Sequence, residues 1–277
     1  MKTITTFFSI AFLCGLFFEN IIKSDKTDKV ERKMRNTRRI ANIEQRRIVA
    51  LEKKYTAILR KALKKQYESY ANNDTLGLSM VEVLRNLYEV ELKYWLQREY
   101  KRLNKDTSKA KEDFFNPIWL EWVDEKTKKL LTSKKIKDID DTTREHINRI
   151  IEDGYNRALT RGEIAKEIKK QANSIRTFKR ARVIARTELA NAVNLAKDKS
   201  SFDFEKETGV TMGKTWIHRG GGIPRDEHIA LDDGITYPRE HQFYAYGEYL
   251  GYPHEEGASA ENVVNCGCQV VYLRLKD

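Results

Sequence analysis

Pro117 is the only proline before Pro224 in this chain of 277 residues. Proline breaks helices because its ring blocks the preceding turn and because it lacks a backbone N–H donor. In the long stretches without proline, apolar residues recur every three or four positions, which is typical of amphipathic helices. We therefore expect the chain before Trp216 to be mostly helical and elongated.

Two helices are predicted in the first hundred residues. An apolar stripe runs through residues 38–70, and the polar run at 72–74 is expected to end that helix. Ser79 and Glu82 have the spacing of a capping box, which predicts the start of the second helix. Residues 104–112 are polar and rich in lysine, and they indicate a loop.

Further helices are predicted between this loop and residue 200. Trp119 and Trp122 are interpreted as core side chains rather than as base-stacking groups, because a helical tryptophan stripe is usually buried. His146 lies among charged residues and is predicted at the surface. The expected helix starts are Pro117, Thr142 or Thr143, the capping box Thr160–Glu163, and Ser174, with the last helix ending near Lys199.

The net charge of +11 is unevenly distributed. From Asn191 onward acidic residues outnumber basic ones by 14 to 9, so the basic surplus lies in residues 1–190. Such a basic half either binds a polyanion or an acidic protein surface, or carries solvated lysine-rich helix faces. Charge alone does not separate these two interpretations.

Residues 4–18 form a nearly continuous apolar run. A run of ~15 residues is shorter than the ~20 needed to cross a bilayer. It has the length of a signal-peptide core but lacks a small-residue cleavage site. Three interpretations stay open: translation starting at Met34, a genuine export or anchoring segment, or an ordinary apolar helix. A membrane partner is expected only if this segment is a real part of the protein.

Arg182 and Arg186 lie one turn apart on the helix that Ser174 is expected to cap. Paired guanidinium groups suit a carboxylate or phosphate target through forked hydrogen bonds. We favour a structural interpretation, in which one of them pairs with Asp232 or Asp233 inside the domain. Glu188 would then pair with Arg225.

The C-terminal third carries strand and turn signals. Residues 213–217 predict a strand, and Asp233-Gly234 predicts a turn that returns as a strand at 235–237. Residues 242–252 are aromatic and glycine-rich, and we interpret them as an irregular packed loop. Residues 266–275 predict a terminal strand. The fold class is therefore α+β, with a compact C-terminal domain containing a small sheet.

Two of the three cysteines, Cys266 and Cys268, stand two residues apart, and four of the five histidines lie between His218 and His254. A disulfide between such close cysteines would be strained, so a reducing compartment fits best. On a strand both sulfurs would face the same way. With His228, and with His218, His254 or an aspartate as a fourth ligand, they would suit Zn²⁺. The alternative is two reduced, buried cysteines beside a hydrogen-bonded histidine.

Several short motifs follow one another in order between residues 182 and 268. Together they resemble the Mu F-like phage head morphogenesis domain of phage minor head proteins, over roughly residues 160–275. Gly267 departs from the family pattern, which usually has arginine between the two cysteines. Besides the cysteines, the residues that carry the resemblance are Arg182, Arg186, Thr187, Glu188, Trp216, Arg225, His228, Asp232, Asp233, Gly234, Phe243 and Asn265.

The resemblance and the composition divide the chain into three parts: an apolar segment and linker at 1–33, a basic helical domain at 34–158, and the Mu F-like domain at 159–277. The resemblance implies a phage or prophage minor head protein, in the virion head or host cytoplasm, that takes part in head assembly. Its partners would be the portal and other capsid proteins, with DNA as a further candidate. No small-molecule substrate is evident, and the role requires no catalysis.

Two other functions stay open. A metal-dependent hydrolase, such as a nuclease, would use His228, Asp232 and the cysteines, although no paired acid and base appears at a recognisable spacing. A nucleic-acid-binding module would act through residues 30–190 and would lose affinity as salt rises.

Overall fold

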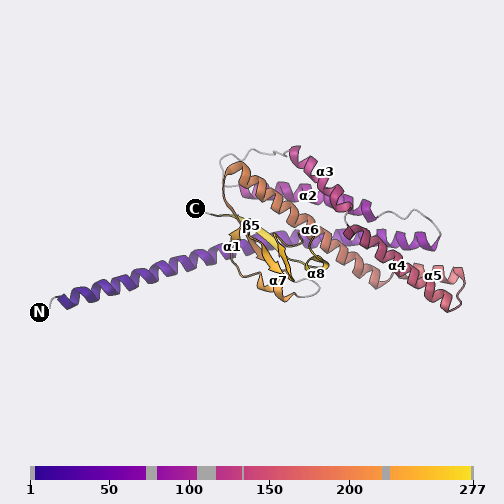
Figure 1. Ribbon diagram of the computed structural model, residues 1–277, viewed down its shortest axis with the longest axis horizontal. Helices are drawn as coiled ribbons and strands as arrows, with labels where there is room; N and C mark the ends of the chain where they lie inside the picture. Colours follow the sequence, from indigo (N-terminus) through magenta and orange to yellow (C-terminus); the bar gives the residue numbers. More distant parts are fainter. Residues whose placement is uncertain (1–3, 73–79, 105–116, 133, 220–224, 276–277) are drawn as a thin grey trace. The chain divides into compact units, whose positions relative to one another are not determined.

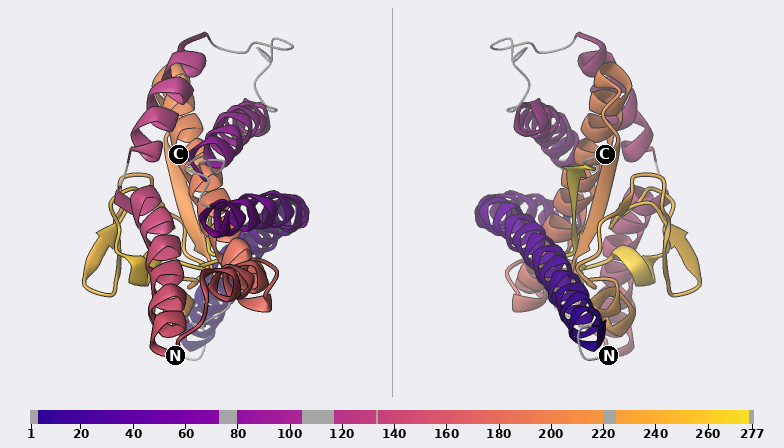
Figure 2. Two further views of the ribbon diagram at one scale, coloured as in Figure 1. Left: turned by 90° about the vertical axis from the view of Figure 1, so that its right-hand side faces the viewer. Right: turned by 90° about the vertical axis from the view of Figure 1, so that its left-hand side faces the viewer.

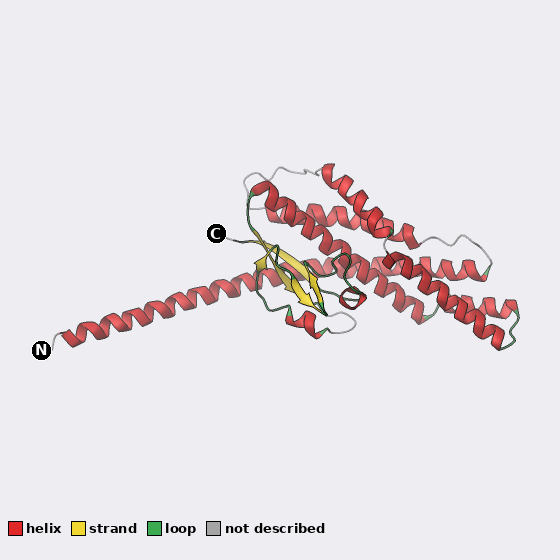
Figure 3. Ribbon diagram, viewed as in Figure 1, coloured by secondary structure: helices red, strands yellow, loops and turns green. Residues whose placement is uncertain are grey.

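The computed structural model describes residues 4–72, 80–104, 117–132, 134–219 and 225–275, and it describes side chains from residue 29 onward, except at 117–118, 134–137 and 140. Most of these residues are helical, and a small antiparallel sheet lies near the C-terminus (Figure 3). The predicted α+β class, with helices first and a small sheet in the C-terminal region, is therefore confirmed.

The chain divides into two compact units, Met1–Glu44 and Gln45–Asp277. The described residues of the first unit are helical and belong to α1 (Ile4–Ala71). The side chains of the apolar run at 4–18 lie outside the described ones, so the three interpretations of that run stay open. Among the helices that the structure describes, none is both long enough and apolar enough to cross a bilayer. The three-part division drawn from the sequence stays a prediction.

Several predicted helix boundaries are confirmed. The first helix ends at Ala71, next to the polar run at 72–74, and α3 (Pro117–Leu131) begins at the proline. The capping box before α5 (Arg161–Ala172) is complete: the Thr160 backbone N donates to the Glu163 carboxylate at 2.8 Å, and the Glu163 N–H donates to the Thr160 hydroxyl at 3.3 Å. Ser79, the predicted cap of α2 (Met80–Asn104), lies outside the described residues.

Two predicted boundaries are wrong. The fourth helix, α4 (Lys134–Asn156), begins before Thr142 and Thr143, whose hydroxyls donate to carbonyl groups four residues earlier within the helix. Ser174 caps α6 (Ile175–Thr208) as expected, but this helix continues past Lys199 to Gly209, which adopts a left-handed conformation at φ 70°. Its last turns are kept helical by burial, since Ser200, Ser201 and Phe204 are fully enclosed.

The main core of the second unit forms around α6, which packs against α2 and against the sheet (Figures 1 and 2). Trp119 belongs to this core at 2% exposure, and its indole N–H donates to Asp203 at 2.8 Å, so the core interpretation of this tryptophan is confirmed. Trp122 is partly buried against the same core. The other large contributors come from α1, α2, α6 and the sheet: Leu59, Trp95, Leu189, Phe204 and Tyr272.

The sheet has the strand order β2–β1–β5 and is antiparallel throughout. The predicted strand at 213–217 is confirmed as β1 (Met212–Ile217), which pairs along its full length with β5 (Gln269–Arg274). The predicted return strand at 235–237 is reduced to β2 (Tyr237–Pro238). The terminal strand begins at Gln269, so the cysteine pair precedes the strand rather than lying on it.

The interpretation of residues 242–252 as an irregular loop is wrong. These residues form the hairpin β3 (Phe243–Ala245) and β4 (Glu248–Leu250). Its two-residue turn, Tyr246-Gly247, has positive φ at both positions, 48° and 77°. Such turns match the twist of paired strands, but tyrosine is an uncommon residue at positive φ, which hid the signal in the sequence.

His146 is half-buried rather than fully at the surface. Its Nδ1 lies 2.7 Å from the Tyr67 hydroxyl, which joins α4 to α1. Burial and the nearby cationic side chain of Arg176 lower the pKa of His146 below its ordinary value. A neutral imidazole at this contact therefore belongs to the packing of the helices.

Candidate functional site

Three buried side chains from two separate segments meet beside the sheet. His228 comes from α7 (Asp226–Ala230), and Cys266 and Cys268 come from the segment that enters β5. The His228 Nδ1 lies 3.4 Å from the Cys266 sulfur and 3.8 Å from the Cys268 sulfur. All three residues are at most 3% exposed, and their ligand atoms lie within 4.8 Å of one another. The structure therefore brings together the three residues predicted as metal ligands.

The cysteine segment is held by hydrogen bonds to α6. The Asn265 backbone N donates to the Thr187 hydroxyl at 2.9 Å, and Asn194 Nδ2 donates to the Cys268 carbonyl at 3.2 Å. Within the segment, the Cys268 backbone N donates to the Cys266 sulfur at 3.4 Å. Both sulfurs thus face His228 because of a turn tied to a helix, not because of strand alternation.

Asn262, in α8 (Ala260–Val263), fixes which nitrogen of His228 carries the proton. The Asn262 amide donates to the Ala245 carbonyl at 3.1 Å and to the Glu248 carboxylate at 2.6 Å, so its Oδ1 is left to accept. That oxygen lies 2.9 Å from the His228 Nε2, which must therefore donate. The His228 Nδ1 consequently presents a lone pair to the two sulfurs.

Two further histidines lie near the thiols. His218 follows β1 directly, and its Nδ1 lies 3.5 Å from the Cys268 sulfur. Its backbone N donates to the Asp232 carboxylate at 3.1 Å. His254 is buried and faces the Cys266 carbonyl oxygen through its Nε2 at 3.1 Å. Of the fourth-ligand candidates predicted from sequence, His218 therefore has a ring nitrogen 3.5 Å from a sulfur, and Asp232 holds the backbone of His218.

The two thiols titrate as a pair. A hydrogen bond from the Cys268 thiol lowers the pKa of Cys266 below its usual range despite burial. The same hydrogen bond, together with burial, raises the pKa of Cys268 above its usual range. The hydrogen bond between the two sulfurs therefore shifts their pKa values in opposite directions.

The two arginines of α6 do have a carboxylate partner, but the predicted partners were wrong. Arg182 Nε donates to the Glu52 carboxylate at 2.9 Å, and Arg186 donates to both Glu52 oxygens at 3.1 Å. Glu52 lies on α1, outside the predicted C-terminal domain. The facing surfaces of α1 and α6 place it between the two guanidinium groups, whereas Asp232 and Asp233 lie in a turn beyond the cysteine segment.

The predicted pair of Glu188 with Arg225 is also wrong. Glu188 accepts a hydrogen bond from the Tyr88 hydroxyl on α2. Arg225 donates to the carbonyl groups of Glu261 and Val264, both at 2.6 Å. Glu188 lies on α6 and is buried where α6 packs against α2, whereas Arg225 lies beside α8. The fold therefore separates the two residues.

The remaining motif residues build the surroundings of the cluster. Trp216 packs edge-on against His228 and Phe243, with both ring centroids at 5.2 Å. Asp233 accepts from the Ile235 backbone N at 2.8 Å, and Gly234 has φ 78°, so this stretch forms the predicted turn. These residues shape the domain around the thiols.

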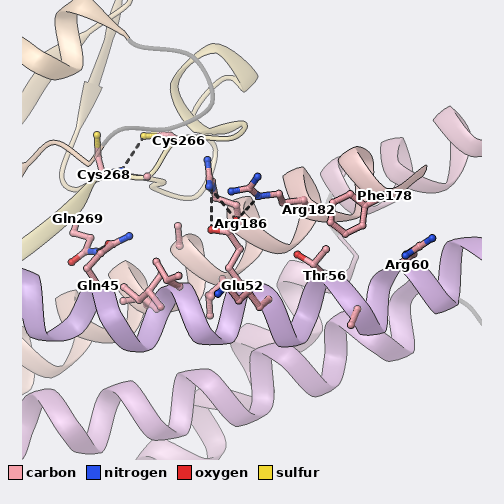
Figure 4. A pocket seen from close by; sticks show the side chains of 18 of the residues that line it. Gln45, Glu52, Thr56, Arg60, Phe178, Arg182, Arg186, Cys266, Cys268 and Gln269 are labelled. Atoms are coloured by element: carbon pink, nitrogen blue, oxygen red, sulfur yellow. Dashed lines mark hydrogen bonds and ion pairs between the residues drawn. The ribbon is translucent and has the colours of Figure 1, made fainter. Parts of the chain in front are cut away.

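A groove with a cavity volume of about 840 Å³ runs between α1 and α6, beside the cysteine segment (Figure 4). Its apolar lining includes Val49, Ala57 and Phe178, which are exposed. Its rim is basic and carries exposed cations from both helices: Lys53, Arg60, Lys61 and Arg182. Sequence reasoning noted the basic helix but missed the groove, because its two walls lie more than a hundred residues apart in the chain.

Residues 149–271 match the family model described as Phage Mu protein F like protein. This part of the chain is a Mu F-like phage protein domain. The Mu F-like match runs from within α4 into β5 and includes α6 and the whole Cys–His cluster, while the α1 wall of the groove lies outside it. It links the protein to phage heads, as the motif series predicted. No curated protein and no solved structure matched the chain.

Three residues that matter at the site were not singled out in the sequence. Glu52 had a visible signal, since it stands alone as an acid among Arg46, Arg47 and the lysines that follow it. Asn194 and Asn262 had none, because an asparagine that holds a backbone or an imidazole is indistinguishable in sequence from one in a loop. Their roles depend on contacts across the fold.

Proposed function

We propose that this protein is a minor head protein of a phage or prophage, that it takes part in head assembly, and that it associates with the portal. The Mu F-like domain supports the link to the phage head. The observation that carries the docking role is the basic groove between α1 and α6. The role is structural, and we assign no catalytic step to it.

The groove suits an amphipathic helix of a partner protein. Val49 and Phe178 are 40% and 36% exposed, large values for apolar side chains. A helix that lays its apolar face into a groove buries such side chains, and burial of apolar surface is the main driving force of association. The groove walls are themselves helices, so the occupant would complete a three-helix arrangement.

The rim specifies an acidic occupant. The exposed cations on both sides of the groove would lie beside carboxylates flanking an apolar stripe. Complementary charge mainly raises the association rate and fixes register. In addition, the Thr56 hydroxyl lines the groove, is buried, and has no hydrogen-bond partner among the described residues. A polar group from the occupant would satisfy it.

DNA is the second candidate, because the rim also suits phosphates. A phosphodiester backbone would not bury the apolar side chains that line the groove, so the protein partner is favoured. The two candidates differ in salt response: DNA binding would fall by orders of magnitude between low and moderate salt, whereas a helix held largely by apolar burial would lose much less.

The test is co-purification of the full chain with the portal protein of the same phage or prophage, and with assembled heads. We expect the double variant Lys53→Glu/Lys61→Glu to weaken portal binding by about tenfold or more through like-charge repulsion. The matched control is Lys166→Glu/Lys169→Glu, which reverses two exposed charges on α5, away from the groove. Equal loss in both variants, or absence of the wild-type protein from heads and portal complexes, would overturn the proposal.

A further inference from the structure

We propose that His218, His228, Cys266 and Cys268 form a tetrahedral Zn²⁺ site with a structural role. The site stands on its own geometry and does not depend on the head-assembly role proposed above. It would join the end of β1, helix α7 and the segment entering β5, which are separate in sequence and meet at these four side chains.

The separations between donor atoms agree with tetrahedral zinc. Bond lengths of about 2.3 Å to sulfur and about 2.0–2.1 Å to nitrogen place a sulfur and a nitrogen on one ion about 3.6 Å apart. The three measured sulfur–nitrogen separations are 3.4 Å, 3.5 Å and 3.8 Å. Among the described residues, the ligand atoms that all lie within 4.8 Å of one another belong to His228, Cys266 and Cys268, so His218 must move toward the other ligands to join them. Its Nδ1 already lies 3.5 Å from the Cys268 sulfur.

The donors have the chemistry that zinc prefers. Two thiolates and two imidazoles form a common structural zinc set. The Asn262 side chain accepts from the His228 Nε2, which directs the lone pair of Nδ1 toward the sulfurs. Such outer hydrogen bonds orient histidine ligands in metal sites, and the backbone N–H that donates to the Cys266 sulfur supports a thiolate in the same way.

A cluster of reduced thiols explains the arrangement less well. The His228 Nδ1 has one lone pair and accepts one hydrogen bond, yet two sulfurs converge on it. Both cysteines are almost fully buried, so water does not add hydrogen bonds to either sulfur. A single cation would satisfy both sulfurs and both imidazoles at once.

His254 serves as an internal control for the fourth ligand. It is as buried as His228 and the two cysteines and more buried than His218, but its Nε2 faces the Cys266 carbonyl oxygen at 3.1 Å. We therefore assign it to holding the cysteine segment and not to the ion. The proposed site therefore requires His218 for metal binding and does not require His254, although both lie next to the cysteines.

The experiment measures zinc and cobalt in the purified full chain. After dialysis against Zn²⁺ and then buffer, the wild-type chain should retain one zinc per chain, and Co²⁺ in its place should give the visible absorption of a tetrahedral thiolate site. His218→Ala should weaken zinc binding at least about tenfold, since even outer residues of zinc sites contribute 10–100-fold. It should also change the cobalt spectrum. His254→Ala should keep the wild-type cobalt spectrum and one zinc per chain.

Cys268→Ser should lose the thiolate-to-cobalt absorption, while Cys14→Ser, which removes the third cysteine, should leave it unchanged. If Cys268→Ser does not fold, the wild-type measurements and the comparison of His218→Ala with His254→Ala still test the zinc site. No retained zinc in the wild-type chain would overturn the site. A His218→Ala variant with unchanged affinity and cobalt spectrum would overturn the assignment of the fourth ligand. Neither result depends on portal binding, so this proposal and the head-assembly proposal fail separately.

Discussion

Arg186 on α6 and Glu52 on α1 form a two-point ion pair, although they lie 134 positions apart in the chain. Two guanidinium nitrogens of Arg186 donate to the two carboxylate oxygens, both at 3.1 Å, and the side chains are 17% and 11% exposed. A third guanidinium nitrogen of Arg186 reaches Asn265 at 3.3 Å. One side chain therefore connects the basic helix, the Mu F-like domain and the cysteine segment.

We expect Glu52→Gln to destabilise the protein by about 1.5–3 kcal/mol, the range for hydrogen bonds to charged groups. The amide replaces one acceptor oxygen with a donor NH₂, so the Arg186 Nε loses its acceptor, and the two guanidinium groups lose their shared counter-ion. The free energy of unfolding in urea measures the change. Glu68→Gln is the control, because it breaks an exposed pair with Lys64 on the same helix and should cost about 0.5 kcal/mol or less. Equal effects from the two substitutions would contradict the role of Glu52.

The buried ammonium group of Lys214 should make the stability of the protein depend on pH between 8 and 10. Burial lowers the pKa of its ammonium group to about 8 from an ordinary value of 10.5, and the residue is 2% exposed. Between these two pKa values the unfolded chain binds more protons at this site than the folded chain. Stability should therefore rise as pH increases from 8 to 10, by about 2 kcal/mol, and this contribution is absent below pH 8.

The measurement is urea unfolding at pH 8, 9 and 10 for the wild type and for Lys214→Met. Subtracting the two series cancels the titration of other groups, and the wild type should gain about 2 kcal/mol of stability relative to Lys214→Met between pH 8 and pH 10. The range stops at pH 10, since burial raises the pKa of Tyr252 and Tyr272 above the ordinary value of 10 and their unfolded forms ionise beyond it. Parallel pH profiles for the two proteins would rule out the Lys214 effect.

Three helix starts were predictable from sequence because their chemistry is local, whereas the start of α4 at Lys134 was not. Thr160 and Ser174 cap helices through hydrogen bonds to residues three positions ahead, and Pro117 fits a first turn without tertiary contacts. The end of α6 was not predictable in this way. Ser200 and Ser201 are polar residues of a kind usually found at protein surfaces, but both are fully buried. The Ser200 hydroxyl donates to the Leu96 carbonyl on α2 at 3.2 Å. Packing against another helix decided the boundary.

The site was predictable in its residue types but not in its contacts. Clustered cysteines and histidines indicated that His228, Cys266 and Cys268 would meet, and they do. The partner of Arg186 could not be inferred, because nothing local connects it to a carboxylate on the first helix. The hairpin at Phe243 was missed because Tyr246 occupies a conformation that glycine or asparagine normally fills.

Asn262→Ala should destabilise the protein by about 1–3 kcal/mol, because it leaves the buried His228 Nε2 without its acceptor, and an unpaired buried polar group costs about that much. Thermal unfolding with a chelator present measures this loss independently of any metal. Asn173→Ala is the control, since this exposed asparagine donates only to the Lys169 carbonyl at the end of α5. A change in the control as large as that in Asn262→Ala would contradict the assignment.

Asn265 combines two separable contributions. Its backbone has φ 58°, in the left-handed region, and its side-chain oxygen accepts from Arg186 at 3.3 Å. Asn265→Ala removes the hydrogen bond and forces alanine into a conformation that costs about 1–2 kcal/mol, so it should be the more damaging substitution. Asn265→Gly removes only the hydrogen bond and should recover about 1 kcal/mol relative to alanine, even though glycine is more flexible when unfolded. Chemical denaturation of the three proteins gives the order asparagine, glycine, alanine. If alanine were at least as stable as glycine, the left-handed turn would not limit this position, and the asparagine before the cysteine pair would be needed for its side chain alone.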